Sequence, residues 1–218
     1  MQRRYAMTAH KIRPPILFSV LTAEAFLVLL LQKQFLFLPI ALLALCVLLF
    51  VRYLPKELGY SVPWLTDLFL SFLVFGALVL GECFYYYTHI PFWDDLLHAM
   101  SGILLALLGF LLFTQRQVLG GVSFAVFGSS LWEMVEYAVD RIFGMNMQKD
   151  SQIQPPLFNF LRIAPIDGTD IGLYDTMADL FYGFLGGIIL AILHMKFPLF
   201  VSRYLLPKKA KERTKHEA

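Results

Sequence analysis

Three pairs of ionisable side chains have a spacing that suits chemistry on a helix. The members of each pair are three or four positions apart, and residues at that spacing lie on one helix face. The pairs are Asp94 with His98, Glu133 with Glu136, and Asp175 with Asp179. Carboxylate oxygens and an imidazole nitrogen are ligands for zinc, manganese, iron, magnesium or calcium ions. The six residues are therefore candidate metal ligands, provided that their helices are neighbours and face one another.

The chain that must position these pairs is too apolar for a water-soluble domain. Of its 218 residues 58% are hydrophobic, and the mean hydropathy is +0.65, whereas soluble domains have roughly 45–50% apolar residues. A helix needs about 20 apolar residues to cross a bilayer. Such runs occur at about residues 16–32, 36–53, 64–84, 93–114, 118–140 and 173–197. We therefore predict an all-α polytopic membrane protein, a bundle of six transmembrane helices that forms one domain over residues 1–218.

Basic residues divide unevenly between the two sides of this predicted bundle. With the N-terminus inside, fourteen of the 18 Lys and Arg residues lie on the inner side, and the exceptions are Lys33, Arg141, Lys149 and Arg162. Because Lys and Arg are retained on the cytoplasmic side during insertion, both termini are expected in the cytoplasm. The basic tail at 203–218 is interpreted as an anchor that meets anionic lipid, and no nucleic-acid partner is expected.

Acidic residues gather at the opposite, external side. Eleven of the 16 Asp and Glu residues fall there. A helix rises about 1.5 Å per residue, so three candidate ligands lie one turn deeper in the membrane than the other three. The deeper set is His98, Glu133 and Asp179, and the shallower set is Asp94, Glu136 and Asp175.

Carboxylates inside a membrane are costly unless a partner neutralises them. Few basic residues are available on the external side, so either several of the acids are protonated or a divalent cation neutralises them. A single histidine makes a mononuclear site at least as consistent with the sequence as a dinuclear one. Glu136 and Asp175 are the predicted proton-transfer residues. Asp94 and Asp175 also lie near the starts of their helices. An alternative interpretation is therefore that they cap these helices and have no further role.

Other residues receive simpler interpretations. The external loop at about 141–172 is long for a compact bundle, which is typical of a lid, a binding element or a link. Glu24, in the middle of the first span, is either a neutral acid or part of a proton path. The aromatic residues at 84–87, Phe92 and Trp93 are interpreted as an interfacial belt, with the lining of a lipid-facing entrance as the alternative. Asp140 is interpreted as a partner of Arg141 or Arg162.

The motifs of the second half of the chain resemble those of a known family. The matching segments are Trp93-Asp94-Asp95-Leu96-Leu97-His98, Trp132-Glu133-Met134-Val135-Glu136, and Tyr174-Asp175-Thr176-Met177-Ala178-Asp179. They resemble the YjdF-type bacterial inner-membrane family of unknown function, and more distantly VanZ-like proteins. The resemblance implies a multi-pass protein of the bacterial cytoplasmic (inner) membrane, and the VanZ-like similarity suggests a role in the cell envelope.

Three functions remain open on the sequence. The first is a metal-dependent hydrolase or transferase that acts on a lipid or envelope precursor. The second is an ion- or proton-coupled transporter, for which Glu24 and Asp67 are the only further candidates for a polar path across the membrane. The third is a non-catalytic membrane protein whose polar cluster holds helices together and presents a loop to a partner.

Overall fold

The computed structural model describes residues 12–113, 116–148 and 171–209. The long helices are α1 (Pro14–Leu31), α2 (Leu38–Glu57), α3 (Trp64–Val74) continued by the π-helix η2 (Phe75–Cys83), α5 (Trp93–Leu112), α6 (Gln117–Phe143) and α8 (Ile171–Lys196). The short elements are η1 (Phe35–Phe37), β1 (Tyr60–Ser61), α4 (Tyr86–His89), α9 (Pro198–Tyr204) and β2 (Lys208–Lys209). Most of the predicted external loop and the end of the basic tail lie outside the described residues.

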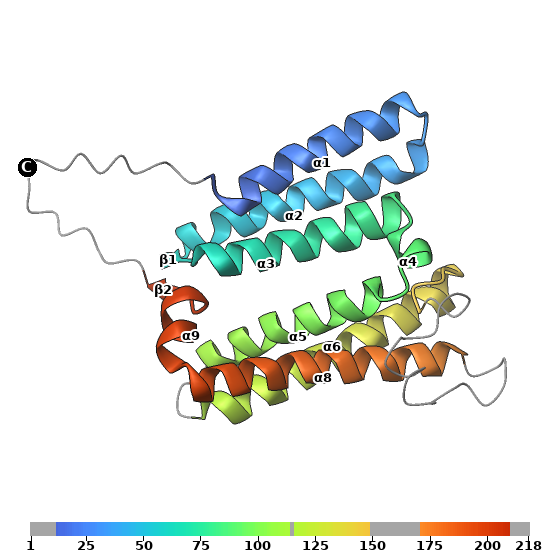
Figure 1. Ribbon diagram of the computed structural model, residues 1–218. Helices are drawn as coiled ribbons and strands as arrows, with labels where there is room; N and C mark the ends of the chain where they lie inside the picture. Colours follow the sequence, from blue (N-terminus) through green and yellow to red (C-terminus); the bar gives the residue numbers. More distant parts are fainter. Residues whose placement is uncertain (1–11, 114–115, 149–170, 210–218) are drawn as a thin grey trace, which may run out of the picture.

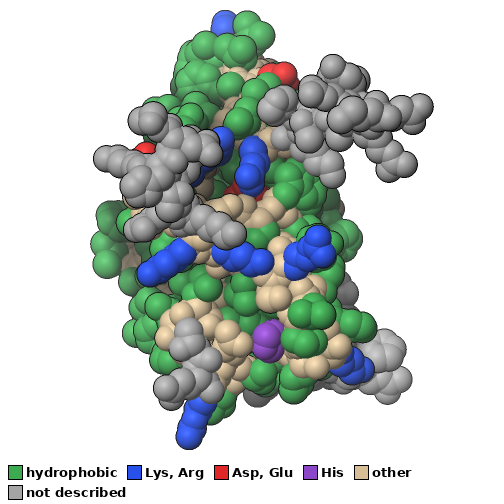
Figure 2. Space-filling model, turned by 90° about the vertical axis from the view of Figure 1, so that its left-hand side faces the viewer, with side chains coloured by type: hydrophobic (Ala, Val, Ile, Leu, Met, Phe, Trp, Pro, Cys, Tyr) green, Lys and Arg blue, Asp and Glu red, His purple; other side chains and the backbone are tan. Residues whose placement is uncertain are grey.

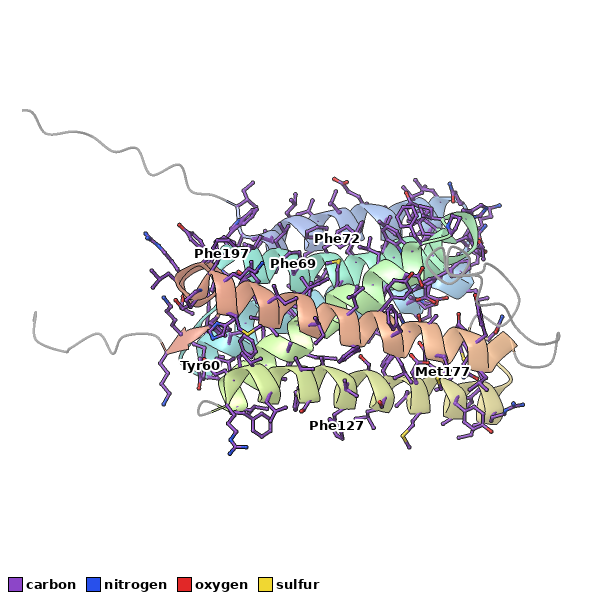
Figure 3. All side chains as sticks on the ribbon, turned by 60° about the horizontal axis from the view of Figure 1, so that its bottom comes forward. Tyr60, Phe69, Phe72, Phe127, Met177 and Phe197 are labelled. Atoms are coloured by element: carbon purple, nitrogen blue, oxygen red, sulfur yellow. The ribbon has the colours of Figure 1, made fainter. Side chains whose placement is uncertain are left out.

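Six of the described helical segments are long and apolar enough to cross a membrane, α2 being counted together with η1 and α3 together with η2. The predicted all-α polytopic fold is therefore confirmed, while the cytoplasmic location of the termini stays a prediction. The surface supports the same conclusion. Phe127 is 61% exposed and Met177 48% exposed, and both lie on the outside of the bundle (Figure 3). Polar residues such as His98 are buried instead, as expected when lipid, and not water, surrounds the helices.

The bundle has two halves of three long helices each (Figure 1). One half contains α1, α2 and α3, and the other contains α5, α6 and α8, which pack against one another. In the second half an apolar core centred on Phe110 and Leu190 fills the interior toward the α9 end. The halves meet where α3 and η2 contact α5, and there the indole Nε1 of Trp93 donates a hydrogen bond of 3.1 Å to the carbonyl oxygen of Gly76.

Glycines allow α5 and α8 to approach closely beside the candidate site. A Cβ atom on Gly102 of α5 would collide with the backbone of Gly183 on α8. A Cβ atom on Gly186 would collide with the carbonyl of Ala99 in the same way. Small residues permit this kind of backbone contact between membrane helices. The contact fixes the relative position of the helices that carry His98 and Asp179.

The two ends of the bundle carry opposite charge. Eight of the described Lys and Arg residues lie at the end where α1, α3 and α6 begin, namely Arg13, Arg52, Lys56, Arg116, Lys196, Arg203, Lys208 and Lys209. Figure 2 looks at this end and shows basic side chains spread across it. The pairing of β1 with β2, with Tyr60 opposite Lys209, closes part of the same surface. The candidate metal ligands lie at the other end, where α5 and α8 begin and α6 ends.

Candidate metal centre

His98 stands at the centre of the acidic cluster and contacts carboxylates from three helices. Its Nε2 atom is 3.6 Å from Asp94 Oδ1, one turn earlier on α5, and 3.6 Å from Asp179 Oδ2 on α8. Its Nδ1 atom is 3.8 Å from Glu133 Oε1 on α6. The helices that carry the three sequence motifs are therefore neighbours, and they turn these side chains toward one another.

Two groups of three residues can each direct one ligand atom at a common point. The first group is Asp94, His98 and Asp179, and the second is Glu133, Glu136 and Asp179. Within each group the ligand atoms lie within 4.8 Å of one another. Asp179 belongs to both groups, so it is the geometric link between the imidazole and the two glutamates.

These two groups differ from the deeper set and the shallower set of ligands that were expected from the rise of the helices. Each group combines two residues of the deeper set with one of the shallower set, because the ligand atoms of Asp94 and Glu136 each lie within 4.8 Å of that of Asp179. Asp175 belongs to neither group. Its role as a direct metal ligand therefore gains no geometric support, and its role in proton transfer stays a prediction.

The deepest carboxylates are buried without hydrogen-bond partners. Glu133 is 4% exposed and Asp179 2% exposed. Both carboxylate oxygens of Glu133 and Oδ2 of Asp179 are sealed from solvent and accept no hydrogen bond from the described residues. Thr176 lies close to Glu133 but does not reach hydrogen-bond geometry. No described Lys or Arg forms an ion pair with either residue.

The distances in the cluster suit ligands arranged around an ion. Separations of 3.6 and 3.8 Å from the imidazole nitrogens are too long for hydrogen bonds, which end near 3.2 Å for N–H···O. Two ligand atoms that each lie about 2.1 Å from one divalent ion are separated by about 3.0–3.5 Å. A small inward movement of Asp94 and Asp179 toward the Nε2 atom of His98 would therefore bring three ligand atoms around one ion. An imidazole with several carboxylates is a donor set that suits zinc, manganese or iron.

Tyr87 is a residue of the site that the sequence did not indicate. It lies on the short helix α4, which follows Tyr85 in the left-handed conformation with φ of 60°. The ring packs against Gly81, where a Cβ atom would collide with it. Burial, and then the charges of Asp94 and Glu82, raise the pKa of Tyr87 well above its usual value. The phenol therefore stays protonated beside the carboxylates.

The aromatic residues here do not form the belt that the sequence suggested. Trp93 is buried and bonded to η2, and Tyr87 faces the acidic cluster. The interpretation as an interfacial belt was therefore wrong for Trp93. The only signal in the sequence was their position directly before the Asp94 motif, which is also compatible with a location in the lipid interface.

Two further acids have structural partners. Asp95 is buried, and Tyr182 of α8 lies close enough to interact with its carboxylate. Asp140 accepts hydrogen bonds from the backbone N–H groups of Met147 and Gln148, at 2.6 and 3.0 Å. These bonds fold the chain back after α6, so within the described residues Asp140 serves the turn and not the predicted arginine pair.

Comparison with known proteins identifies the family. Residues 14–198 match the model of the family described as "Predicted membrane protein (DUF2238)". This chain belongs to that family. The expectation of a membrane family without a known activity is thus confirmed, whereas the more distant VanZ-like similarity is not.

A relative of this DUF2238 chain occurs in Thermotoga maritima. It is described as an uncharacterized protein and is 30% identical over 147 residues, which cover 63% of this chain and 66% of the relative. The match thus spans just under two thirds of the relative's length. No solved structure matches the chain. The comparisons therefore supply a family but no ligand, substrate or reaction.

Proposed function

We propose that this DUF2238 protein holds a divalent metal ion between α5, α6 and α8 and uses it to hydrolyse or transfer a group of a lipid or envelope precursor. The observation that carries the proposal is the set of sealed oxygen atoms on Glu133 and Asp179, which lie beside His98 and have no hydrogen-bond partner among the described residues. Buried carboxylates in such a position require a cation or protons. Asp179 is the proposed central ligand, joined by His98 and Asp94 in one group or by Glu133 and Glu136 in the other.

The residues around the site supply the other parts of a hydrolytic reaction. A metal ion in this position would polarise a phosphoryl or acyl oxygen or activate a water molecule. Asp175 lies close enough to Asp179 for their charges to interact, yet outside both ligand groups. It is the proposed acceptor of the proton from water, and Glu136 takes this role if it does not bind the ion. The protonated phenol of Tyr87 is a hydrogen-bond donor for the substrate or for a carboxylate.

The location of the site favours an amphipathic substrate. His98 is five residues from the start of α5, which places it roughly 7 Å inside the helix end. The outer surface of the neighbouring helix α6 is apolar, with Trp132 and Met134 exposed. A lipid can therefore bring its headgroup to the site while its chains remain in the bilayer.

Transport receives less support than catalysis. Glu24 is exposed on the outer surface of α1 and does not face the bundle interior. Asp67 lies at the opposite end, where it pairs with Arg13 at 3.1 Å. Between the acidic cluster and that end, the interior of the α5, α6 and α8 half is the apolar core around Phe110. Within the described residues, this apolar core thus lies between the acidic cluster and the basic end.

The decisive experiment is metal analysis of the purified protein, followed by an activity assay. Wild type is expected to retain about one equivalent of a divalent metal, and His98→Ala and Glu133→Gln are expected to lose it. His89→Ala is the matched histidine control, because His89 is exposed and its Nδ1 contacts the carbonyl oxygen of Tyr85 in its own turn. Metal content near zero in wild type, even after incubation with zinc, manganese or iron, would refute the site.

Activity and structural roles are separated by a second measurement. Metal-loaded protein is assayed for release of phosphate or fatty acid from phospholipids and isoprenoid phosphates, and Asp175→Asn is expected to abolish turnover while it keeps the metal. Metal binding without turnover of any of these substrates would favour the alternative, in which the ion only ties three helices together. Ion flux through proteoliposomes that is lost in Glu24→Gln would instead establish transport.

A further inference from the structure

A basic cavity lies at the end of the bundle that is opposite to the candidate metal centre. It has a volume of about 240 Å³ and is lined by the ends of α1, α2 and α3 and by the residues of β1. Three cationic side chains, Arg13, Arg52 and Lys56, contribute to its wall, and Asp67 is the one acid among the lining residues. The cavity therefore carries an excess of two positive charges.

The single acid does not neutralise all of these cations. Asp67 Oδ2 pairs with Arg13 Nη1 at 3.1 Å, and the same guanidinium nitrogen donates to the carbonyl oxygen of Val62. The Nε atom of Arg52 is sealed from solvent and has no hydrogen-bond acceptor within the part of the chain that the structure describes. A buried guanidinium donor without an acceptor is unfavourable. An anion in the cavity would instead balance the excess of positive charge on its wall.

The chemistry of the lining fits a phosphate group. Arginine donates bidentate hydrogen bonds to phosphate oxygens, and lysine adds a point charge. Tyr60 and Ser61 also line the cavity and can contribute hydroxyl donors. These groups stand at the ends of membrane-spanning helices, which is the depth of lipid headgroups. Basic pockets between transmembrane helices bind anionic headgroups in this way.

We propose that the cavity formed by Arg13, Arg52 and Lys56 binds the phosphate group of an anionic lipid headgroup. The site is independent of the metal centre, which lies at the other end of the bundle. A lipid held here contacts α1, α2 and α3 together and fixes the arrangement of these three helices. Free phosphate has the same recognition chemistry, so the test must distinguish the two sources.

The test is equilibrium binding of short-chain phosphatidylglycerol to the full-length protein in detergent, measured by calorimetry. Wild type is expected to bind phosphatidylglycerol more tightly than short-chain phosphatidylcholine or inorganic phosphate. The double variant Arg52→Gln/Lys56→Gln removes two charges and is expected to weaken binding about tenfold or more. The control Arg116→Gln/Lys196→Gln removes two exposed charges from the same end, outside the cavity, and is expected to change the affinity less than about twofold.

A variant that should strengthen the binding of phosphatidylglycerol shows that a loss of binding in the double variant is not caused by misfolding. Asp67→Asn removes the acid of the cavity and nearly keeps its shape, so phosphatidylglycerol should bind several times more tightly. Equal affinity of wild type and Arg52→Gln/Lys56→Gln, or an equal loss in the control, would overturn the proposal. Weaker binding to Asp67→Asn would do the same. Inorganic phosphate that binds as tightly as phosphatidylglycerol would assign the cavity to a free phosphate and overturn the lipid assignment.

Discussion

Two buried carboxylates at opposite ends of the bundle have opposite surroundings. Asp67 is 6% exposed, pairs with Arg13 at 3.1 Å and has Arg52 and Lys56 nearby. Asp179 is 2% exposed, and the charged groups around it are the carboxylates Asp94, Asp175, Glu133 and Glu136. A carboxylate removed from water needs a compensating positive charge. The chain supplies that charge at the basic end, whereas at the acidic end we propose that an ion from solution supplies it.

The largest expected difference between the two ends comes from the same substitution made at each. Asp179→Asn removes the ligand that both groups share, so metal affinity should fall by at least about 100-fold, since even changes around metal ligands cost about 10–100-fold. In the presence of a chelator the same variant should be as thermostable as wild type or more so, because one repelling charge is gone. Metal analysis and thermal unfolding with and without chelator measure both effects. If Asp179→Asn retains as much metal as wild type, Asp179 is not a metal ligand.

Asp67→Asn should show the reverse pattern. Metal content should stay unchanged, while the free energy of unfolding falls by about 1–2 kcal/mol because Arg13 loses its partner. The value is below that of a fully buried pair because the Arg13 side chain is 43% exposed. Glu57→Gln, an exposed acid at the same end, is the control for the loss of one charge. A lower metal content in Asp67→Asn would mean that the two ends of the bundle are coupled, and it would contradict their expected independence.

The helix contact that brings the acidic end together gives a third, intermediate effect. Gly186→Ala places a methyl group against the backbone of Ala99 and should push α8 away from α5. We expect a destabilisation of about 1–3 kcal/mol and weaker metal binding, because His98 and Asp179 move apart. Gly128→Ala is the control, because its added methyl meets only the flexible side chain of Leu105. Thermal unfolding and metal titration of both variants test the expectation, and equal behaviour of the two would contradict it.

Much of the fold was predictable because hydropathy and helix length are local properties. Six apolar runs gave six spans, and the helical spacing of the three motifs correctly put the members of each pair on one face. The relative rotation of the helices depends on packing at particular residues, such as Gly102 against Gly183, and spacing carries no information about it. The sequence therefore predicted a deeper and a shallower set of three ligands, whereas the structure has two groups that share Asp179.

The parts of the site that the sequence missed are those set by irregular backbone. Tyr87 reaches the cluster because η2 is a π-helix and Tyr85 adopts the left-handed conformation. Neither feature has a reliable signature in the sequence, since Tyr85 is not a glycine or an asparagine. The basic cavity was missed for a related reason. Arg52 and Arg13 are far apart in the chain, and their positive charge was explained by insertion alone.

The smallest expected effect concerns the proton on Tyr87. Its raised pKa means that the folded protein keeps the phenolic proton above about pH 10, where the unfolded chain loses it. Stability should therefore fall as pH rises above about 10, and this decline should be shallower in Tyr87→Phe. Metal binding neutralises part of the surrounding negative charge, so it should lower the pKa of Tyr87 toward its usual value. Phenolate absorbance measured as wild type minus Tyr87→Phe, with and without metal, tests both statements. If the titration of Tyr87 does not respond to metal, the ion does not bind near Asp94 and Asp179. The proposed difference between Asp179, neutralised by an ion, and Asp67, neutralised by Arg13, would then lose support.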